Sequence, residues 1–431
     1  MINVKKKTIK IKTAGTIQSL LTAEECAQTR CLKLEGPLSR EDLIFLNELE
    51  LDELDLKKTE IGDNIDLFVK GFRHIKCIQF PDDITYLEEY TLSFCRGLEK
   101  VCLPAKLKKI GDHTFSYSKN LKEISIDANN QSYQTIDNIV YDKSGKRLCY
   151  CNESREGIFT VNKGIEKLSG DSFRGCSLLT KISLPDSLQE IGPCAFMECE
   201  GLTEIVIPDG VTALKTNTFF GCSKLSKITL PSTLNKIDNE CFEKCTSLTE
   251  IHLPAAVYSL TNPFGECSKL EHIYVDSSNK TFKDIDGVLT DKEGKNLISY
   301  PGGKKGTYQV PNGIIHIKDF AFEFCRKLSN LIVDEGATSI GKRAFRGCFE
   351  LTRIELPCTM TRIGDRAFDC CSYMTSFTCK SVIPPQCHKN TFSFVNTDDC
   401  PLYVPQDSIE FYKKAEGWNL FVNIFPLSDK E

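Results

Sequence analysis

The sequence has no long apolar run, few histidines and no excess of positive charge. None of its hydrophobic stretches approaches the roughly 18 residues that a membrane-spanning helix needs, so we expect no integral membrane segment. The net charge is −5, from 54 lysines and arginines against 59 aspartates and glutamates. A nucleic-acid-binding protein would carry a clustered basic excess instead, so nucleic acid is not expected as a partner.

Signatures of catalysis are missing as well. The six histidines are scattered along 431 residues, and no G-x-S-x-G, H-E-x-x-H or phosphate-loop motif occurs. We therefore predict that the protein is not an enzyme and has no catalytic residue, no metal site and no cofactor. A thiol-dependent hydrolase is a weaker alternative, because it needs an exposed cysteine and the pattern described below buries the recurring cysteines.

The first twelve residues lack the apolar core of a signal peptide. Lysines interrupt this stretch at Lys5, Lys6, Lys7, Lys10 and Lys12. A cytoplasmic protein and a protein whose signal peptide has been removed both agree with this observation.

A phenylalanine recurs at intervals of about 23 residues, which is the spacing of a repeat protein. Cysteine follows it after three residues, leucine after six, an aliphatic residue after nine, and leucine or isoleucine, usually before proline, after eleven. A second apolar pair precedes each phenylalanine. The recurring residues are Phe115, Phe173, Phe196, Phe219, Phe242, Phe264, Phe322, Phe345, Phe368 and Phe392.

Each unit reads L-x-x-I-x-L-P-x-x-L-x-x-I-x-x-x-A-F-x-x-C-x-x. The I-x-L portion alternates with period two, which predicts a strand, and the proline that follows ends it. The second apolar pair and the phenylalanine are expected to fill the same core from the opposite wall. Because no unit has a helical period, we predict a solenoid of about 15 thin, strand-rich coils.

Two intervals between phenylalanines are 58 residues long instead of about 23. The inserted segments, 127–161 and 276–310, match each other at a shift of 149 residues, for example at Gly145 and Gly294. Each contains two short strand-like stretches around a glycine turn. We therefore expect two long coils, each carrying a projecting hairpin.

The two ends depart from the repeat, as terminal units of a solenoid do. The N-terminal region 1–64 is predicted to contain strands at Thr8–Lys12 and around Leu32, with a helix near Ile17–Cys26 and another opened by Ser39. The repeats are expected over 65–395 and a C-terminal cap over 396–431. Large apolar groups of that cap are Tyr412, Trp418, Phe421 and Phe425.

The unit resembles the BspA-like, or Treponema-type, leucine-rich repeats of bacterial surface proteins. The match lies in Ile191-Gly192, Ala195-Phe196, Cys199, Leu202 and Ile205 to Pro208, with their equivalents over about residues 65–395. The stretch Ala14–Ile17 with Leu32–Gly36 is similar to the cap of such proteins in Bacteroides-type bacteria.

This resemblance implies an α/β repeat fold: a leucine-rich-repeat solenoid with an α/β N-terminal cap and a short C-terminal cap. It also implies a cell-surface or secreted protein that acts by protein recognition or adhesion. The implied partner is a protein, including host extracellular-matrix or cell-surface proteins. The family has no catalytic residues, so none can be carried over.

The sequence contains 22 cysteines, and nine of them form a column at the third position after the phenylalanine or, for Cys95, after the equivalent Leu92. Equivalent Cα atoms on adjacent coils should lie about 4.8 Å apart, which a disulfide could span. A uniform column has no pairing preference and lacks the ligand spacing of zinc sites. A small buried thiol under a turn can instead donate a weak hydrogen bond, so we predict free, buried thiols.

The outward-facing positions of the strands suggest a binding surface. Charges alternate along one outward column from Lys181 to Glu250, which indicates a solvated, self-complementary stripe. The alternation stops at His272, where rings gather beside the second inserted segment. Since tyrosine is favoured at binding hot spots, we predict a protein-binding surface here, with glycan binding as the alternative and a merely solvated face as the simplest reading. Its residues are His252, His272, Tyr274 and Ile332.

Overall fold

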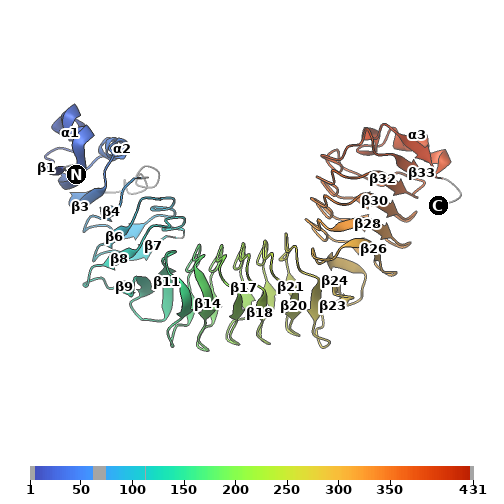
Figure 1. Cartoon of the computed structure of the whole chain (residues 1–431), viewed down its shortest axis with the longest axis horizontal. Coiled ribbons are helices and arrows are strands. Elements are labelled where there is room, and N and C mark those ends of the chain that lie inside the picture. Colours follow the sequence, from blue (N-terminus) through green and yellow to red (C-terminus); the bar gives the residue numbers. More distant parts are fainter. Residues whose placement is uncertain (1–4, 62–73, 112, 428–431) are drawn as a thin grey trace. The chain divides into compact units, whose positions relative to one another are not determined.

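The computed structural model describes residues 5–61, 74–111 and 113–427. The chain forms two compact units, Met1–Leu202 (unit 1) and Thr203–Glu431 (unit 2). Each unit is a β-solenoid, and the short helices of the described residues lie toward the chain ends (Figure 1). Strands from the I-x-L portion of each repeat form what we call the first wall. Two-residue strands from the second apolar pair form the second wall.

Unit 1 begins with an α/β cap, as predicted. Its strands stack in parallel and lead directly into the first wall of the repeats. The helix expected near Ile17–Cys26 is two elements, because Thr22 and Glu25 form a capping box that starts a new helix. The cap elements are β1 (Lys5–Lys10), η1 (Ile17–Leu20), α1 (Ala23–Gln28), β2 (Thr29–Pro37), α2 (Arg40–Glu48) and β3 (Glu53–Glu60).

The second cap helix begins where the sequence predicts. The Ser39 side chain accepts from the backbone N–H of Asp42, and the Asp42 carboxylate accepts from that of Ser39. The first wall of unit 1 continues through β4 (Cys77–Gln79), β6 (Lys100–Leu103), β8 (Glu123–Ile126), β12 (Gly157–Thr160) and β14 (Leu179–Ser183). The second wall contains β5 (Tyr86–Leu87), β7 (Lys109–Ile110), β13 (Lys167–Leu168) and β15 (Glu190–Ile191).

Unit 2 has the same two walls. Its first wall contains β16 (Glu204–Val206), β18 (Lys227–Thr229), β20 (Glu250–Leu253), β22 (His272–Val275), β26 (Gly306–Val310), β28 (Leu328–Val333), β30 (Arg353–Leu356), β32 (Ser376–Cys379), β33 (Leu402–Val404) and β34 (Ile424–Pro426). Its second wall contains β17 (Ala213–Leu214), β19 (Lys236–Ile237), β21 (Ser259–Leu260), β27 (His316–Ile317), β29 (Ser339–Ile340) and β31 (Arg362–Ile363). The C-terminal cap adds η3 (Gln406–Ser408), α3 (Ile409–Tyr412) and η4 (Trp418–Leu420).

The solenoid has about 18 turns, slightly more than the expected 15 or so. The difference arises because strands of both caps stack in the same parallel ladders as the repeats. In unit 1, β1, β2 and β3 precede β4 in one sheet, and in unit 2, β33 and β34 follow β32.

Each long coil carries three strands, not two, and does not project as a free hairpin. In unit 1 these are β9 (Tyr133–Ile136), β10 (Ile139–Asp142) and β11 (Arg147–Cys151); in unit 2 they are β23 (Phe282–Ile285), β24 (Val288–Asp291) and β25 (Asn296–Ser299). The predicted turn at Gly145 does join two antiparallel strands. However, β11 pairs in parallel with β13, so the three strands extend the second wall. Val140, Tyr141 and Leu148 are buried there, which a projecting hairpin could not achieve.

The phenylalanines stack into a buried aromatic column along each unit. Ring centroids of Phe345 and Phe368, for example, are 5.3 Å apart and nearly parallel. In the long coils Tyr150 and Tyr300 take the place of phenylalanine, with Tyr150 against Phe115 and Tyr300 against Phe322. Each long coil therefore adds a ring to the aromatic column, next to Phe115 in unit 1 and next to Phe322 in unit 2. Each fully buried ring contributes about 2–3 kcal/mol of hydrophobic stabilisation.

The cysteine column hydrogen-bonds one coil to the preceding one. The thiol of Cys348 donates to the carbonyl of Phe322 over 3.1 Å, and that of Cys371 to the carbonyl of Phe345 over 3.2 Å. None of the 22 cysteines, all of which lie in the described residues, forms a disulfide. Burial raises the pKa of several of these thiols, among them Cys245, Cys325 and Cys267, the last to about 12. The prediction of free, buried thiols in this column is confirmed.

The glycine after the second-wall isoleucine lets adjacent coils approach closely. A Cβ atom on Gly364 would lie 2.5 Å from the carbonyl carbon of Gly341 on the preceding coil. No side chain fits at that distance, so the Ile-Gly pair of the repeat reflects backbone-to-backbone packing.

Candidate functional site

Three rings lie side by side on the outer side of the first wall of unit 2. Strands β20 and β22 are parallel neighbours, and their register places His252 opposite Tyr274. The ring centroids of His252 and Tyr274 are 4.8 Å apart, and those of Tyr274 and His272 are 5.3 Å apart at an interplanar angle of 7°. We call these three residues the ring row.

The ring row is open to solvent on its outer side. The His252 side chain is 69% exposed, and its Nε2 lies 3.3 Å from the Glu250 carboxylate. Tyr274 is 37% exposed, and His272 is half-buried. Since aromatic groups with one free face supply much of the energy at protein interfaces, the arrangement is suited to recognition.

The long coil explains why the row ends at His272. The Ile273 N–H donates to the carbonyl of Gly287, so the turn before β24 occupies the place of the next first-wall strand. Gly287 has a φ of +77°, and a Cβ on it would lie 2.7 Å from Nδ1 of His272. Glycine is therefore required both by the turn and by the neighbouring imidazole.

The structure does not bring the fourth predicted residue, Ile332, to the ring row. Ile332 lies on β28 and pairs with Gln309 on β26 and Glu355 on β30. Strand β22 belongs to a two-stranded sheet with β20, whereas β26 starts a separate six-stranded sheet. The inserted long coil breaks the ladder that would have made these residues neighbours.

Unit 1 carries no rings at the same positions beside its own long coil. There Cys102 pairs with Ser125, and Lys100 forms a 2.6 Å ion pair with Glu123 on the next strand. The ordinary stripe of opposite charges is therefore compatible with a long coil. The ring row is a local feature of unit 2 and is not required by the fold.

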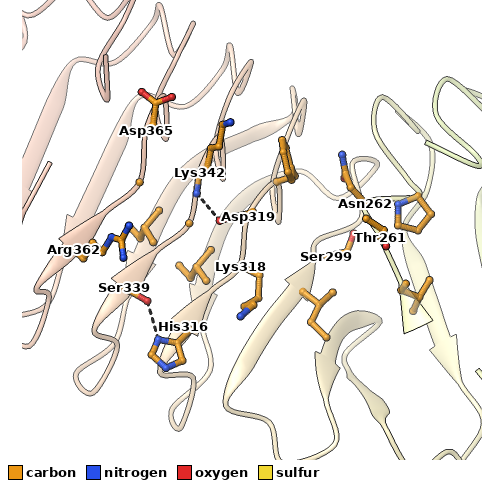
Figure 2. A pocket seen from close by; sticks show the side chains of 18 of the residues that line it. Thr261, Asn262, Ser299, His316, Lys318, Asp319, Ser339, Lys342, Arg362 and Asp365 are labelled. Carbon is orange, nitrogen blue, oxygen red and sulfur yellow. Dashed lines mark hydrogen bonds between the residues drawn. The ribbon is translucent and has the colours of Figure 1, made fainter. Parts of the chain in front are cut away.

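A groove with a volume of about 900 Å³ lies on the second wall of unit 2. It opens where the second wall is interrupted, because β21 ends one sheet and β25 with β27 belongs to another. Figure 2 shows His316, Lys318 and Arg362 on one side of the groove, and Thr261, Asn262 and Ser299 on the other. The side chains of His316 and Ser339 are hydrogen-bonded over 2.8 Å.

One hydroxyl group that bridges the break in unit 1 is missing at the corresponding position of unit 2. In unit 1 the Ile110 N–H donates to the hydroxyl of Tyr133 over 3.2 Å, which joins the long coil to β7, the preceding strand of the second wall. At the shift of 149 residues, Tyr133 corresponds to Phe282, which lines the groove and has no hydroxyl. The difference between Tyr133 and Phe282 is visible when the two inserted segments are aligned, but only the structure shows that Phe282 lines a groove.

The described residues contain no group of three or more His, Cys, Asp or Glu side chains placed to hold a metal ion. The one strongly exposed cysteine among them, Cys358, donates to the Glu335 carboxylate, which raises the pKa of its thiol. A thiol nucleophile needs the opposite shift, so this arrangement does not favour thiol catalysis. Within these residues no helix is long and apolar enough to cross a bilayer.

Comparison with known proteins gives one family and several similar folds. The model of the BspA type leucine rich repeat region matches six copies, over residues 42–146, 166–285 and 305–403. A leucine rich cell surface protein from Faecalibacterium prausnitzii is 24% identical, with 82% of this chain and 88% of that chain covered and a TM-score of 0.54. A leucine-rich repeat protein from Bacteroides ovatus is 17% identical, with 98% and 92% covered and a TM-score of 0.44. No curated protein matches the chain.

Proposed function

Because the chain belongs to the family of BspA type leucine-rich repeat proteins, we propose that it is a non-enzymatic recognition scaffold that binds another protein through the ring row of unit 2. The family supplies a repeat scaffold of the kind that generally binds proteins. The observation that carries the proposal is the set of three stacked, solvent-facing rings of His252, Tyr274 and His272.

The comparison between the two units supports a role in binding. Cys102, Ser125 and Glu123 occupy the equivalent strand positions in unit 1, and Glu123 forms an ion pair with Lys100, so packing alone does not demand rings in unit 2. Exposed rings cost solubility unless a partner covers them, and tyrosine gives large contact area with little loss of side-chain freedom.

We further propose that the protein acts outside the cell or at the bacterial cell surface, and that its partner is a host extracellular-matrix or cell-surface protein. The support is an analogy at the level of fold, since the similar Faecalibacterium protein is described as a cell surface protein. A cytoplasmic location is the alternative, and fractionation of the native bacterium distinguishes the two.

The test is to replace His252, His272 and Tyr274 together by alanine and measure binding to immobilised matrix proteins, with collagen, laminin and fibronectin as probes. We expect the wild type to bind at least one of them and the triple variant to bind at least tenfold more weakly, since one hot-spot ring contributes about 2 kcal/mol.

The matched control replaces Glu123 and Ser125 by alanine at the equivalent positions of unit 1, and it should leave affinity unchanged. Circular dichroism and thermal melting establish that both variants remain folded. Undiminished binding by the folded triple variant contradicts the ring-row proposal. Failure of the wild type to bind any of the three probes contradicts the assignment to a matrix partner.

A further inference from the structure

We propose that the groove on the second wall of unit 2 binds an acidic glycan, with carboxylate or sulfate groups of the sugar chain against Lys318, Lys342 and Arg362. This site is separate from the ring row, which lies on the first wall. It takes a ligand of a different chemical class and does not depend on the proposed protein partner.

The first argument is the balance of charges within the groove. Asp319 accepts the backbone N–H of Lys342 over 2.7 Å, and Asp365 Oδ1 lies 3.0 Å from Nδ1 of His388 without a hydrogen bond. Within the described residues, the ammonium groups of Lys318 and Lys342 have no carboxylate at ion-pair distance, and neither has the guanidinium of Arg362. The groove therefore presents three basic side chains against the two carboxylates of Asp319 and Asp365, a balance that favours an acidic ligand.

The second argument is that three successive coils supply these cations, since β27, β29 and β31 are hydrogen-bonded neighbours. Arg362 lies in β31 opposite Ser339, whereas Lys318 directly follows β27 and Lys342 follows β29 by two residues. The cations are therefore staggered along the strand direction. A chain-like acidic ligand that crosses the three coils could contact all of them.

The third argument favours a glycan over an acidic peptide. Peptides recognised in an extended form usually pair with a free strand edge, but β21, which borders the groove, is only two residues long. The groove instead presents the hydroxyl groups of Thr261 and Ser299 and the amide of Asn262 opposite the cations (Figure 2). Neutral donors and acceptors beside cations match the hydroxyl groups and acidic groups of such a sugar chain.

The dimensions agree with this assignment. The volume of about 900 Å³ lies within the usual range of ligand sites. Apolar atoms of Leu260, Phe282 and Ile298 line the interior and can cover the less polar faces of sugar rings. The site therefore combines an apolar floor with polar groups along its rim.

The experiment measures binding of fluorescent oligosaccharides to the full chain by anisotropy. The probes are a heparin octasaccharide for sulfate, an oligogalacturonate for carboxylate, maltooctaose as a neutral chain, and an oligoglutamate peptide of matched charge. We expect at least one acidic glycan to bind, maltooctaose not to bind, and the affinity to fall as salt is raised from 50 to 300 mM, because exposed charges are screened.

The variant Lys318→Gln/Lys342→Gln/Arg362→Gln should lose at least tenfold in affinity, and Lys318→Gln alone should lose less. The control Lys224→Gln/Lys280→Gln/Lys414→Gln removes the same charge from exposed sites of unit 2 outside the groove and should bind as the wild type does. All six side chains are exposed, so the fold should survive.

Each outcome bears on the proposal. Binding of the sulfated probe alone, or of the carboxylated probe alone, supports it and identifies the acidic group. Equal losses in the groove variant and in the control show general electrostatic attraction and overturn it. Oligoglutamate binding as tightly as either glycan overturns the glycan assignment, and no binding of any acidic glycan overturns the site. The ring-row variant should bind these probes normally, so failure of one proposal does not decide the other.

Discussion

Replacement of Glu153 by glutamine should stabilise unit 1 at neutral pH. Glu153 lies in the turn that follows β11 and is 5% exposed. It packs closely against Gly175, since a Cβ atom on Gly175 would lie 2.9 Å from Oε2 of Glu153. Burial is the main cause that raises its pKa from 4.5 to about 7, and a hydrogen bond from the backbone of Tyr117 opposes the rise.

The sign of the pH dependence follows from where the proton is held. Between pH 4.5 and 7 the folded protein keeps Glu153 protonated while the unfolded chain is ionised, so the proton favours folding. Stability therefore falls as pH rises through this window and is lowest above pH 7. A rise of the pKa from 4.5 to about 7 corresponds to ~3 kcal/mol.

Glutamine keeps the shape and the acceptor oxygen but cannot ionise. We expect Glu153→Gln to raise the free energy of unfolding by ~3 kcal/mol at pH 8 and to change it little at pH 4.5, as measured by urea denaturation at several pH values. Burial also raises the pKa of Glu243 in unit 2 to about 7. Only the double variant Glu153→Gln/Glu243→Gln should therefore lose most of the dependence of stability on pH.

An unchanged pH slope in Glu153→Gln, or equal destabilisation at pH 4.5 and pH 8, would refute this reasoning. The first result would mean that the carboxyl group is hydrated in the folded protein. The second would mean that the contact with the Tyr117 backbone, not the burial of a charge, governs its energy.

Three further predictions concern the coils themselves. Arg174→Ala should lower the stability of unit 1 by about 3 kcal/mol, since Arg174 is buried with its partner Asp171 at 3.0 Å and removal leaves the carboxylate with His113 alone. Gly364→Ala should destabilise unit 2 by about 1–3 kcal/mol in thermal or urea melts, because its Cβ would meet the backbone of the preceding coil. Ellman's reagent should find Cys358 to be the most reactive thiol of the native protein, yet slower than free cysteine because Glu335 raises its pKa, with most thiols reacting only on unfolding.

Each of the three has a control and a contradicting result. Arg174→Lys keeps the positive charge. If it lowers stability as much as Arg174→Ala does, the packing of the arginine side chain, and not its ion pair with Asp171, is the source of the stabilisation. A Cβ on Gly265 would have the flexible Glu243 side chain as its nearest neighbour, so Gly265→Ala should lower stability less than Gly364→Ala. Equal losses of stability in the two variants would contradict the role of close backbone contact between coils. A thiol that reacts with Ellman's reagent faster than free cysteine, and that still does so in the Cys358→Ser variant, would support the hydrolase alternative.

In both units, polar side chains bridge the turns on either side of the long coil. In unit 1, Arg174 reaches across the long coil to the hydroxyl of Tyr117, which it approaches to 2.5 Å. In unit 2 the bridging pairs are Asn262 with Glu323 and Arg326 with Glu266. Both sets of polar contacts join turns about 60 residues apart in sequence, where ordinary coils would be linked through their neighbours. The inserted segments are thus compensated by side chains that the repeat pattern does not require.

The sequence by itself determined the features that repeat. A period of 23 residues decides which side chains face the core, because each coil meets the next in the same way. For that reason the strand register of His252 and Tyr274 and the buried thiols could be predicted. The cap helix begun by Ser39 could be predicted from its local capping box. Family membership follows from the same periodic residues.

Only the tertiary structure decided what happens where the period is interrupted. Pattern alone could not tell whether a long coil projects or joins a wall, since that depends on which strand edges are open to it. By joining the second wall, the coil leaves Ile332 in a different sheet from Tyr274. It also puts Tyr150 and Tyr300 into the aromatic column and opens the groove beside Phe282. These are non-local consequences of strand pairing, which no residue spacing specifies.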